Sequence, residues 1–378
     1  MNNGDENYNL ININSSAKPS NPSHSHHQHN QKIVLTIKEL NEIKYPKSLP
    51  NLSLLEISKD EKPIVNLVVI GHVDSGKSTL MGHLLYLMGE IDERTLNKYE
   101  KESKRIGKNT FHFAWAMDED AEERKRGVTV DIAYKHFQTK SKSVNVMDAP
   151  GHKDFIPNMI AGTSAADFAL LIVDSGKNSF DAGFFSGGQT KEHAILARSL
   201  GVKKLIVCVN KLELWDWSKE RFDFIKNLLQ DYLNSLDFKD EDLHFIPVSG
   251  LHGVSLKDKA HELLSEPKCE NKSLVNLMWY EGPSIVQLID SLDPPVRDYE
   301  SPLRFSITDV GNTTVGSLQG FGIFGKVESG VVYAEQEYLI NPLNLKVKIR
   351  GKFFLVLIRF KKNKLCKYFL VNFSYWNE

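Results

Sequence analysis

The sequence predicts an α/β fold in which a mostly parallel sheet carries helices on both faces and is followed by the start of an antiparallel β-barrel. From Ile64 onward, apolar runs of strand length alternate with amphipathic stretches of helix length, the pattern of parallel strands joined by crossover helices. A Gly-rich turn at residues 71–78 joins the first such strand to the first helix. After Pro294-Pro295, short β-like segments separated by Gly-containing turns replace the alternation, as in barrels and sandwiches.

The expected elements follow in chain order. We expect strands at residues 65–71, 143–148, 167–174, 204–211 and 244–249, and helices at 78–89, 192–201 and 222–237. The first helix should end near Gly89, and the highly charged stretch 90–126 should form an insertion that is helical in part. Because parallel strands deliver their following loops to one edge of the sheet, we expect the ligand site there.

Composition excludes several classes of protein. The 47 Lys and Arg residues balance 48 Asp and Glu residues to a net charge of -1, so the chain lacks the basic excess of a charge-driven nucleic-acid binder. The three cysteines are far apart, which argues against a disulfide framework or a CxxC metal site. Apolar runs fall short of the roughly 20 residues that span a bilayer. We therefore expect a cytoplasmic protein with no membrane contact.

The chain divides into four predicted regions. Residues 1–62 are rich in Asn, Ser, His and Pro, and we interpret them as a disordered tail and linker. The histidines of this tract could bind a transition metal, but accidental histidines in a polar low-complexity segment are the favoured interpretation. Residues 63–293 form the α/β domain, 294–342 a partial β-barrel, and 343–378 an atypical basic and aromatic tail.

The strongest local signal is Gly71-His72-Val73-Asp74-Ser75-Gly76-Lys77-Ser78, which matches a phosphate-binding loop in the strand-to-helix context that this motif requires. Backbone N–H groups of such a loop surround phosphate oxygens. Lys77 would reach the terminal phosphates and Ser78 would offer its hydroxyl to Mg²⁺. The alternative is a chance Gly-rich turn. By itself the loop indicates only a nucleoside triphosphate.

A second signal, Asp148-Ala149-Pro150-Gly151-His152, follows the strand SVNVM. Asp148 at the strand end can hold Mg²⁺ through water, and Gly151 lets a backbone N–H approach the γ-phosphate. His152 would then orient the attacking water as the catalytic residue, whereas a solvated loop histidine is the alternative. Between this element and the phosphate loop lies Arg126-Gly127-Val128-Thr129. Thr129 is the candidate second hydroxyl ligand of Mg²⁺ in a mobile segment, with a plain strand-entry threonine as the alternative.

A third pair of signals predicts where a base binds. Asn210, Lys211 and Glu213 follow the strand KLIVCV, and Ser249, Gly250 and Leu251 follow the strand HFIPV. The Asn210 amide and the carboxylate can hydrogen-bond a purine, and the Lys211 stem can cover its face. Guanine, unlike adenine, offers N1–H and an exocyclic amine to a carboxylate. Since Glu213 is one methylene longer than the aspartate of an NKxD element, guanine selectivity could be weakened. The alternative is a helix-starting Asn-Lys with a solvated glutamate.

Taken in order, GHVDSGKST, RGVT, DAPGH, NKxE and SGL resemble the five nucleotide elements of the translational GTPases, the family of elongation factor Tu and elongation factor 1-alpha. The resemblance runs from about Pro63 to Ile340. The stretches DAPGHKDFIPNMIAG, FDAGFFSGGQTKEHAILARSLGV, WSKERFDFI and GPSIVQLIDSLDPP are most similar to the branch of HBS-type ribosome-rescue GTPases, which act with Pelota.

This resemblance implies a GTP-binding domain at 63–293 that uses GTP/GDP and Mg²⁺ and hydrolyses GTP. It assigns phosphate contacts to Asp74, Ser75, Gly76, Lys77, Ser78, Thr79 and Gly151, and an apolar gate to Val73 and Val128. The gate would hold His152 away from the attacking water until the ribosome moves it. The implied partners are the ribosome and a Pelota-type A-site factor, with the GTPase itself a monomer.

Two other functions stay open from the sequence: an elongation-factor-like carrier of aminoacyl-tRNA and a nucleotide-binding scaffold with little turnover. The GTPase subunit of sulfate activation shares the phosphate loop and the DxPGH element, but the stretch around Gly187-Gly188-Gln189-Thr190 argues against it. The C-terminal region is the main departure from the family. Two barrels follow the GTPase domain in this branch, but only the start of the first is recognisable here. Residues 346–367 carry nine Lys and Arg. We expect non-homologous sequence from a truncated gene model; an RNA-binding extension and ordinary barrel strands are the alternatives.

Overall fold

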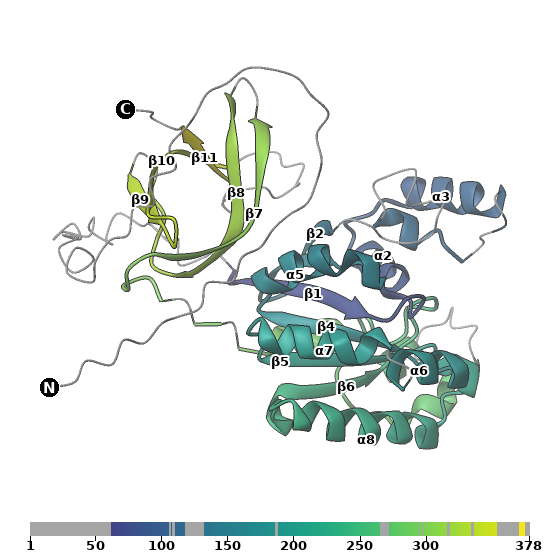
Figure 1. Cartoon of the computed structure of the whole chain (residues 1–378). Coiled ribbons are helices and arrows are strands. Elements are labelled where there is room, and N and C mark those ends of the chain that lie inside the picture. Colours follow the sequence, from purple (N-terminus) through teal and green to yellow (C-terminus); the bar gives the residue numbers. More distant parts are fainter. Residues whose placement is uncertain are drawn as a thin grey trace, which may run out of the picture. The chain divides into compact units, whose positions relative to one another are not determined.

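The structure, a computed structural model, describes residues 62–105, 107, 110–117, 132–185, 188–264, 272–293, 295–296, 298–315, 318–333, 336–353 and 370–374. The chain divides into two compact units, Met1–Lys59 and Asp60–Glu378. The first unit, with the predicted tail and its histidines, lies outside the described residues. The elements below all belong to the second (Figure 1).

A six-stranded sheet forms the centre of the α/β domain, in the order β2-β3-β1-β4-β5-β6. Strands β1, β3, β4, β5 and β6 are parallel, and β2 runs antiparallel to β3 at one edge. The strand bounds are Ile64–Gly71 (β1), Ala133–Gln138 (β2), Ser143–Asp148 (β3), Phe168–Asp174 (β4), Lys204–Asn210 (β5) and Leu243–Pro247 (β6). The predicted mostly parallel sheet is confirmed. The antiparallel β2 was not anticipated, because AYKHFQ lacks the continuous apolar run of the other strands.

Helices cover both faces of this sheet, as predicted (Figure 1). One core cluster joins side chains of β1, β4 and β5 to α5, α6, α7 and α8; a second joins the opposite side of the same strands to α2 and α10. The helices are α2 (Lys77–Leu87), α3 (Glu93–Arg105), α5 (Ile156–Ala165), α6 (Lys177–Phe184), α7 (Gln189–Ser199), α8 (Lys219–Ser235), α9 (Ala260–Leu264) and α10 (Ile285–Ser291).

The end of α2 agrees with the helix end that the sequence predicts near Gly89. Helix α2 ends at Leu87, and Gly89 follows with a φ of 83°, a left-handed conformation that glycine adopts without steric cost. Helix α3 occupies part of the charged stretch 90–126.

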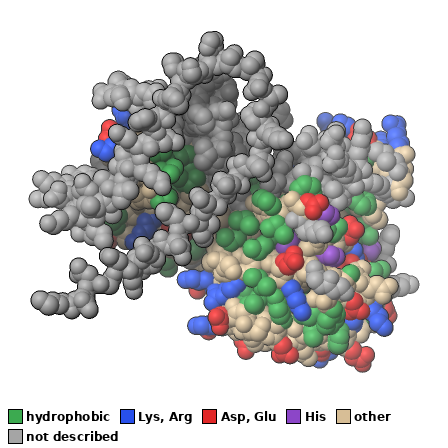
Figure 2. Space-filling model, in the orientation of Figure 1, with side chains coloured by type: hydrophobic (Ala, Val, Ile, Leu, Met, Phe, Trp, Pro, Cys, Tyr) green, Lys and Arg blue, Asp and Glu red, His purple; other side chains and the backbone are tan. Residues whose placement is uncertain are grey.

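On the face drawn in Figure 2, which α7 and α8 cover in the view of Figure 1, acidic and basic side chains are interspersed. Among the described residues on this face, cations and anions therefore alternate instead of forming a patch of a single sign.

A second, antiparallel sheet has the order β7-β8-β11-β10-β9. Its strands are Arg304–Val315 (β7), Leu318–Ser329 (β8), Glu337–Ile340 (β9), Leu345–Phe353 (β10) and Leu370–Ser374 (β11). These strands fit the predicted start of a barrel.

The sheet does not end at the predicted boundary near residue 342. Strand β10 pairs with β9 and β11, so the basic stretch LKVKIRGKF supplies strands, one of the alternatives left open by the sequence. Apolar residues at 345, 347 and 349 alternate with cations at 346, 348 and 350, which is the period of a strand with one polar face. The high count of cations obscured that alternation. Residues 354–369 and 375–378, also part of the predicted tail, lie outside the described residues.

Among the helices that the structure describes, each is too short or too polar to cross a membrane.

Candidate functional site

The predicted motifs meet at the carboxyl edge of the parallel strands. Gly71 ends β1, Asp148 ends β3, Asp174 ends β4 and Asn210 ends β5. The register aligns these ends, since Val69 pairs with Asp148, Gly71 with Ile172, and Asp174 with Asn210. Parallel pairing therefore brings together loops as far apart in the chain as those after Gly71 and Asn210.

The phosphate loop requires its glycines. Gly76 has a φ of 91°, and a Cβ atom there would lie 2.5 Å from Asn210 Nδ2. A Cβ atom at Gly71, whose φ is 149°, would lie 2.3 Å from the carbonyl oxygen of Ile172. Both contacts are too short for any larger residue. The loop thus approaches β4 and β5 closely, and leads directly into α2, whose N-terminal N–H groups form an anion site.

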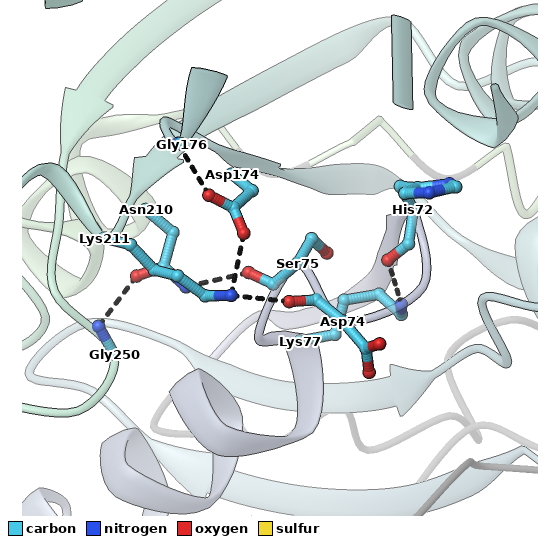
Figure 3. Close-up of polar contacts among 9 residues, drawn as sticks. All are labelled: His72, Asp74, Ser75, Lys77, Asp174, Gly176, Asn210, Lys211 and Gly250. Carbon is cyan, nitrogen blue, oxygen red and sulfur yellow. Dashed lines mark hydrogen bonds and ion pairs between the residues drawn. The ribbon is translucent and has the colours of Figure 1, made fainter. Parts of the chain in front are cut away.

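Lys77 is the first residue of α2, at the end of this loop, and it is buried. Its ammonium donates a hydrogen bond to the carbonyl oxygen of Gly71 at 3.1 Å and another to that of His72 at 2.8 Å, the second of which is drawn in Figure 3. Burial lowers the pKa of Lys77 to about 8, although Asp148 and Asp74 act in the opposite direction. A buried cation held by carbonyl oxygens is available to an anion that offers stronger acceptors.

Gly151 places the second motif beside this lysine. A Cβ atom at Gly151 would lie 2.3 Å from Lys77 Nζ, so a larger residue would displace the lysine ammonium from its place between the two elements. The next residue, His152, has a side chain that is 41% exposed. Its Nδ1 accepts a hydrogen bond from the backbone N–H of Asp154 at 3.2 Å. The imidazole thus follows directly after the residue that lies against Lys77, and it is open to solvent.

The hydroxyl of Ser78 donates a hydrogen bond to Asp148 Oδ2 at 2.7 Å. A hydroxyl and a carboxylate so close form a hard oxygen donor set, which suits Mg²⁺. In the described part of the chain no three His, Cys, Asp or Glu side chains gather into a metal cage. The predicted Thr129, with Arg126, Gly127 and Val128, lies outside the described residues.

Asn210 connects the phosphate loop to the predicted base loop. Its amide donates to the carbonyl oxygen of Ser75 at 2.9 Å and accepts from the backbone N–H of Gly250 at 2.9 Å (Figure 3). Lys211 Nζ donates to the carbonyl oxygen of Asp74 at 2.7 Å. Both residues thus link β5 to the loop after β1 and fix the distance between the two ends of the site.

Glu213 and Ser249 meet at the other end. The Ser249 hydroxyl is fully buried and donates to Glu213 Oε1 at 2.8 Å. Glu213 Oε2 is buried and has no hydrogen-bond partner among the described residues. A buried carboxylate oxygen without a donor is costly, and a base that offers N–H groups would satisfy it. Two predicted residues remain. Leu251 is exposed beside Gly250, and Thr79 is half-buried in the first turn of α2.

Comparison with known families agrees with this geometry. Residues 62–295 match the model of the elongation factor Tu GTP binding domain. The chain belongs to this family. Its α/β domain is therefore that of a translational GTPase, and GTP/GDP is the nucleotide of the family.

Curated relatives in this GTPase family extend beyond the domain. The chain is 45% identical to Protein HBS1 of Drosophila melanogaster over 77% of this chain and 42% of that protein. It is 42% identical to the elongation factor 1 alpha-like protein of Schizosaccharomyces pombe over 79% of this chain and 48% of the relative. It is 40% identical to elongation factor 1-alpha of Desulfurococcus mucosus over 78% of this chain and 64% of that protein. The chain thus spans about half the length of the first two relatives.

A solved structure supports the fold. The GTPase-like domain of S. cerevisiae Ski7, bound to GTP, superposes with a TM-score of 0.64 at 20% identity and covers 86% of this chain and 72% of that one. At this identity the likeness concerns the fold alone.

The structure adds two residues to the GTPase site that sequence reasoning missed. Asp174 ends β4; its Oδ2 accepts from Lys211 Nζ at 2.7 Å and its Oδ1 from the backbone N–H of Gly176 at 2.7 Å (Figure 3). Its position after the strand FALLIV, at the same edge as Asn210, was a signal that could have identified it.

The second missed residue is His193 on α7. Its Nδ1 accepts a hydrogen bond from the backbone N–H of Gly71 at 3.1 Å. His193 thus holds the first residue of the phosphate loop. Burial, and then the charge of Lys77, lower the pKa of His193 to about 3. The imidazole is therefore neutral at physiological pH, as an acceptor at Nδ1 requires. The sequence offered no signal beyond a histidine on a helix.

Proposed function

We propose that this protein is a cytoplasmic, ribosome-activated GTPase that acts with a Pelota-type A-site factor in the rescue of stalled ribosomes. The observation that carries the proposal is the convergence of Lys77, Gly151 and Asn210 at one sheet edge, in a chain 45% identical to Protein HBS1. Lys77 supports phosphate binding, and Gly151 supports the approach of a backbone N–H to the γ-phosphate. Asn210 supports base binding.

At the phosphate end, residues 74–79 bind the phosphates through backbone N–H groups and the Lys77 ammonium. The Lys77 side chain already points along the loop, so it exchanges the carbonyl oxygens of Gly71 and His72 for phosphate oxygens. Ser78, Asp148 through water and Thr129 are the proposed Mg²⁺ ligands. When bound, Mg²⁺ neutralises charge on the phosphates.

His152 is the proposed catalytic residue. It follows Gly151, which lies against Lys77, and its half-exposed ring can turn toward a water beside the terminal phosphate. Orienting that water is a general-base type of contribution, worth about 10²- to 10⁴-fold in rate. Val73 is half-buried in the phosphate loop and, with Val128, is the proposed apolar gate. We expect slow intrinsic hydrolysis, with the ribosome moving His152 into position.

At the base end, Asn210, Lys211, Glu213 and residues 249–251 bind guanine. Support comes from the unsatisfied Glu213 Oε2, which can accept from the N–H groups of guanine, while adenine offers an N1 acceptor that would oppose it. Guanine is thereby selected over adenine.

A carrier of aminoacyl-tRNA is a second candidate, favoured by the similar identity, 44%, to elongation factor 1-alpha of Tetrahymena pyriformis over 73% of this chain and 60% of that protein. Both functions use the same nucleotide cycle. They differ in the macromolecule that the GTP form delivers to the ribosomal A site.

Single-turnover GTP hydrolysis distinguishes these functions. Empty 80S-type ribosomes would be mixed with the protein and either a Pelota-type factor or aminoacyl-tRNA, and phosphate release recorded. The rescue function predicts stimulation that needs the Pelota-type factor and falls about a hundredfold or more in His152→Ala, with GTP affinity unchanged. His261→Ala, which removes an exposed histidine on α9, is the matched control.

The other outcomes reject the rescue proposal. Stimulation by aminoacyl-tRNA alone would identify a carrier. Tight GTP binding without stimulated hydrolysis under either condition would identify a nucleotide-binding scaffold.

A further inference from the structure

Glu213 is the residue at which the base site departs from the NKxD pattern, and a histidine lies beside it. His252 follows the Ser249-Gly250-Leu251 element by one residue. Its Nδ1 lies 3.0 Å from the Ser249 hydroxyl oxygen and 3.6 Å from Glu213 Oε1. Neither the motif nor the family resemblance assigned His252 a role.

The three side chains form a directed set of hydrogen bonds. The Ser249 hydroxyl has one proton, which it donates to Glu213 Oε1. Its oxygen is therefore left as an acceptor for Nδ1–H of His252, and it also accepts from the His252 backbone N–H at 3.2 Å. The direction of donation thus runs from His252 through Ser249 to the carboxylate.

The loop that carries His252 is fixed at several points. Gly250 donates its N–H to Asn210, and its carbonyl oxygen lies 2.8 Å from His83 Nδ1 on α2. Burial lowers the pKa of His83 to about 4, so this ring is neutral and donates through Nδ1. Gly253 donates its N–H to the carbonyl oxygen of Ser249 at 2.9 Å. His252 is accordingly presented from a rigid turn, although its side chain is 45% exposed.

A glutamate has one more rotatable bond than an aspartate, and fixing that bond costs rotamer entropy. Contacts from Ser249 and His252 converge on Oε1 alone, which leaves Oε2 buried and free of partners among the described residues. Restraint of one carboxylate oxygen by the protein orients the other for a ligand. The nearby Glu213 carboxylate also raises the pKa of His252, consistent with an interaction between the two groups.

We propose that His252 is a positioning residue for base recognition: through Ser249 it holds the longer Glu213 carboxylate so that Oε2 receives the exocyclic amine of guanine. The inference rests on the proposed guanine site and deepens it. His252 acts through Glu213 and makes no contact with the nucleotide itself, so its substitution should change base selectivity without changing phosphate binding.

The experiment compares equilibrium binding of GDP with that of inosine diphosphate, which lacks the exocyclic amine. The ratio of the two dissociation constants measures the interaction at that amine. His252→Ala should weaken GDP binding roughly tenfold and leave inosine diphosphate within about twofold, as expected for one charge-assisted hydrogen bond lost. His252→Asn retains an N–H donor near the position of Nδ1 and should restore the ratio of the unmodified protein.

Glu213→Gln separates failure of this inference from failure of the guanine site itself. If the unmodified protein binds both nucleotides equally, the site does not read the exocyclic amine and the role of His252 is refuted, whereas equal binding of GDP and ADP would refute the guanine assignment itself. If Glu213→Gln removes the preference for GDP but His252→Ala does not, the guanine site stands and the role of His252 is refuted. Equal weakening of both nucleotides by His252→Ala would indicate a merely structural residue and would also refute it. In the Glu213→Gln background, His252→Ala should have no further effect on the ratio.

Discussion

The phosphate end and the base end of the site differ in what their sequence leaves variable. At the phosphate end, Gly71, Gly76 and Gly151 sit where any Cβ would collide with Ile172, Asn210 or Lys77. At the base end, Glu213 replaces a shorter acid, and Ser249 and His252 make contacts that accommodate it. Phosphate binding by backbone groups depends on close approach, which permits almost no variation. Base binding depends on side-chain reach, which neighbouring residues can adjust.

The largest expected effect tests the phosphate end. Lys77→Met should weaken GTP and GDP binding by on the order of a hundredfold or more, because a buried charge-assisted contact to phosphate is lost. The nucleotide-free protein should be as stable as before or more stable, since the substitution removes a buried cation. Isothermal titration and urea unfolding measure the two quantities. A large loss of stability without nucleotide would contradict the view that Lys77 serves the ligand rather than the fold.

Asn210→Ala tests the link between the two ends. The amide bridges Ser75 and Gly250, so its removal leaves a buried carbonyl and a buried N–H unpaired, at about 2 to 3 kcal/mol in unfolding free energy. GDP and inosine diphosphate should both bind tens of times more weakly, because the two ends lose their common support. If GDP alone were affected, Asn210 would act only at the base. Asn234→Ala, an exposed amide on α8 that donates to Asp240, is the matched control.

A smaller effect concerns His193, which supports the phosphate loop, and the dependence of protein stability on pH. His193 has a pKa of about 3 in the folded protein instead of its ordinary 6.5, so the unfolded chain binds the extra proton first. Stability should therefore fall as pH drops below 6.5, by about 1 to 2 kcal/mol at pH 5 from this residue. Urea unfolding at pH 7 and pH 5 measures the loss. His193→Asn should reduce the difference; His83, also depressed, should account for a remainder. An unchanged difference would exclude His193 as its source.

The smallest effect is at the base end. Ser249→Ala removes the hydroxyl between His252 and Glu213 and should weaken GDP binding about fivefold, the worth of about 1 kcal/mol, with inosine diphosphate little changed. Competition binding at fixed ionic strength provides the test. Comparable weakening of both nucleotides would mean that Ser249 supports the loop and not the carboxylate, which would erase the contrast between the two ends.

Much of the fold was readable before the structure because its signals are local. Continuous apolar runs such as FALLIVD and KLIVCVN predicted parallel strands buried on both faces. The edge strand β2 was missed since half-exposed residues at an edge need no such run. Strand β10 was misplaced in a tail because nine cations drew attention away from the alternation of residues 345–350.

The residues of the candidate site also divide into those that local motifs identified and those that only the structure revealed. Phosphate-loop, DxPGH and NKxE residues were found from motifs, and the structure brings the described ones to one edge; their roles in binding and catalysis stay predictions. Asp174, His193 and His252 belong to no motif. They became visible only through contacts with residues 37 to 122 positions away in the chain, which spacing along the sequence cannot reveal.

By itself, the sequence determined the α/β class, the order of the motifs and the chemistry that each motif offers, because helix and strand periods and glycine conformations are properties of short segments. Only the tertiary structure decided which side chains complete the site. Parallel register placed the ends of β1, β3, β4 and β5 together, and packing of α2 and α7 against them fixed which histidines stand beside Gly71, Gly250 and Glu213. Those contacts depend on long-range closure of the chain, whose outcome no local pattern encodes.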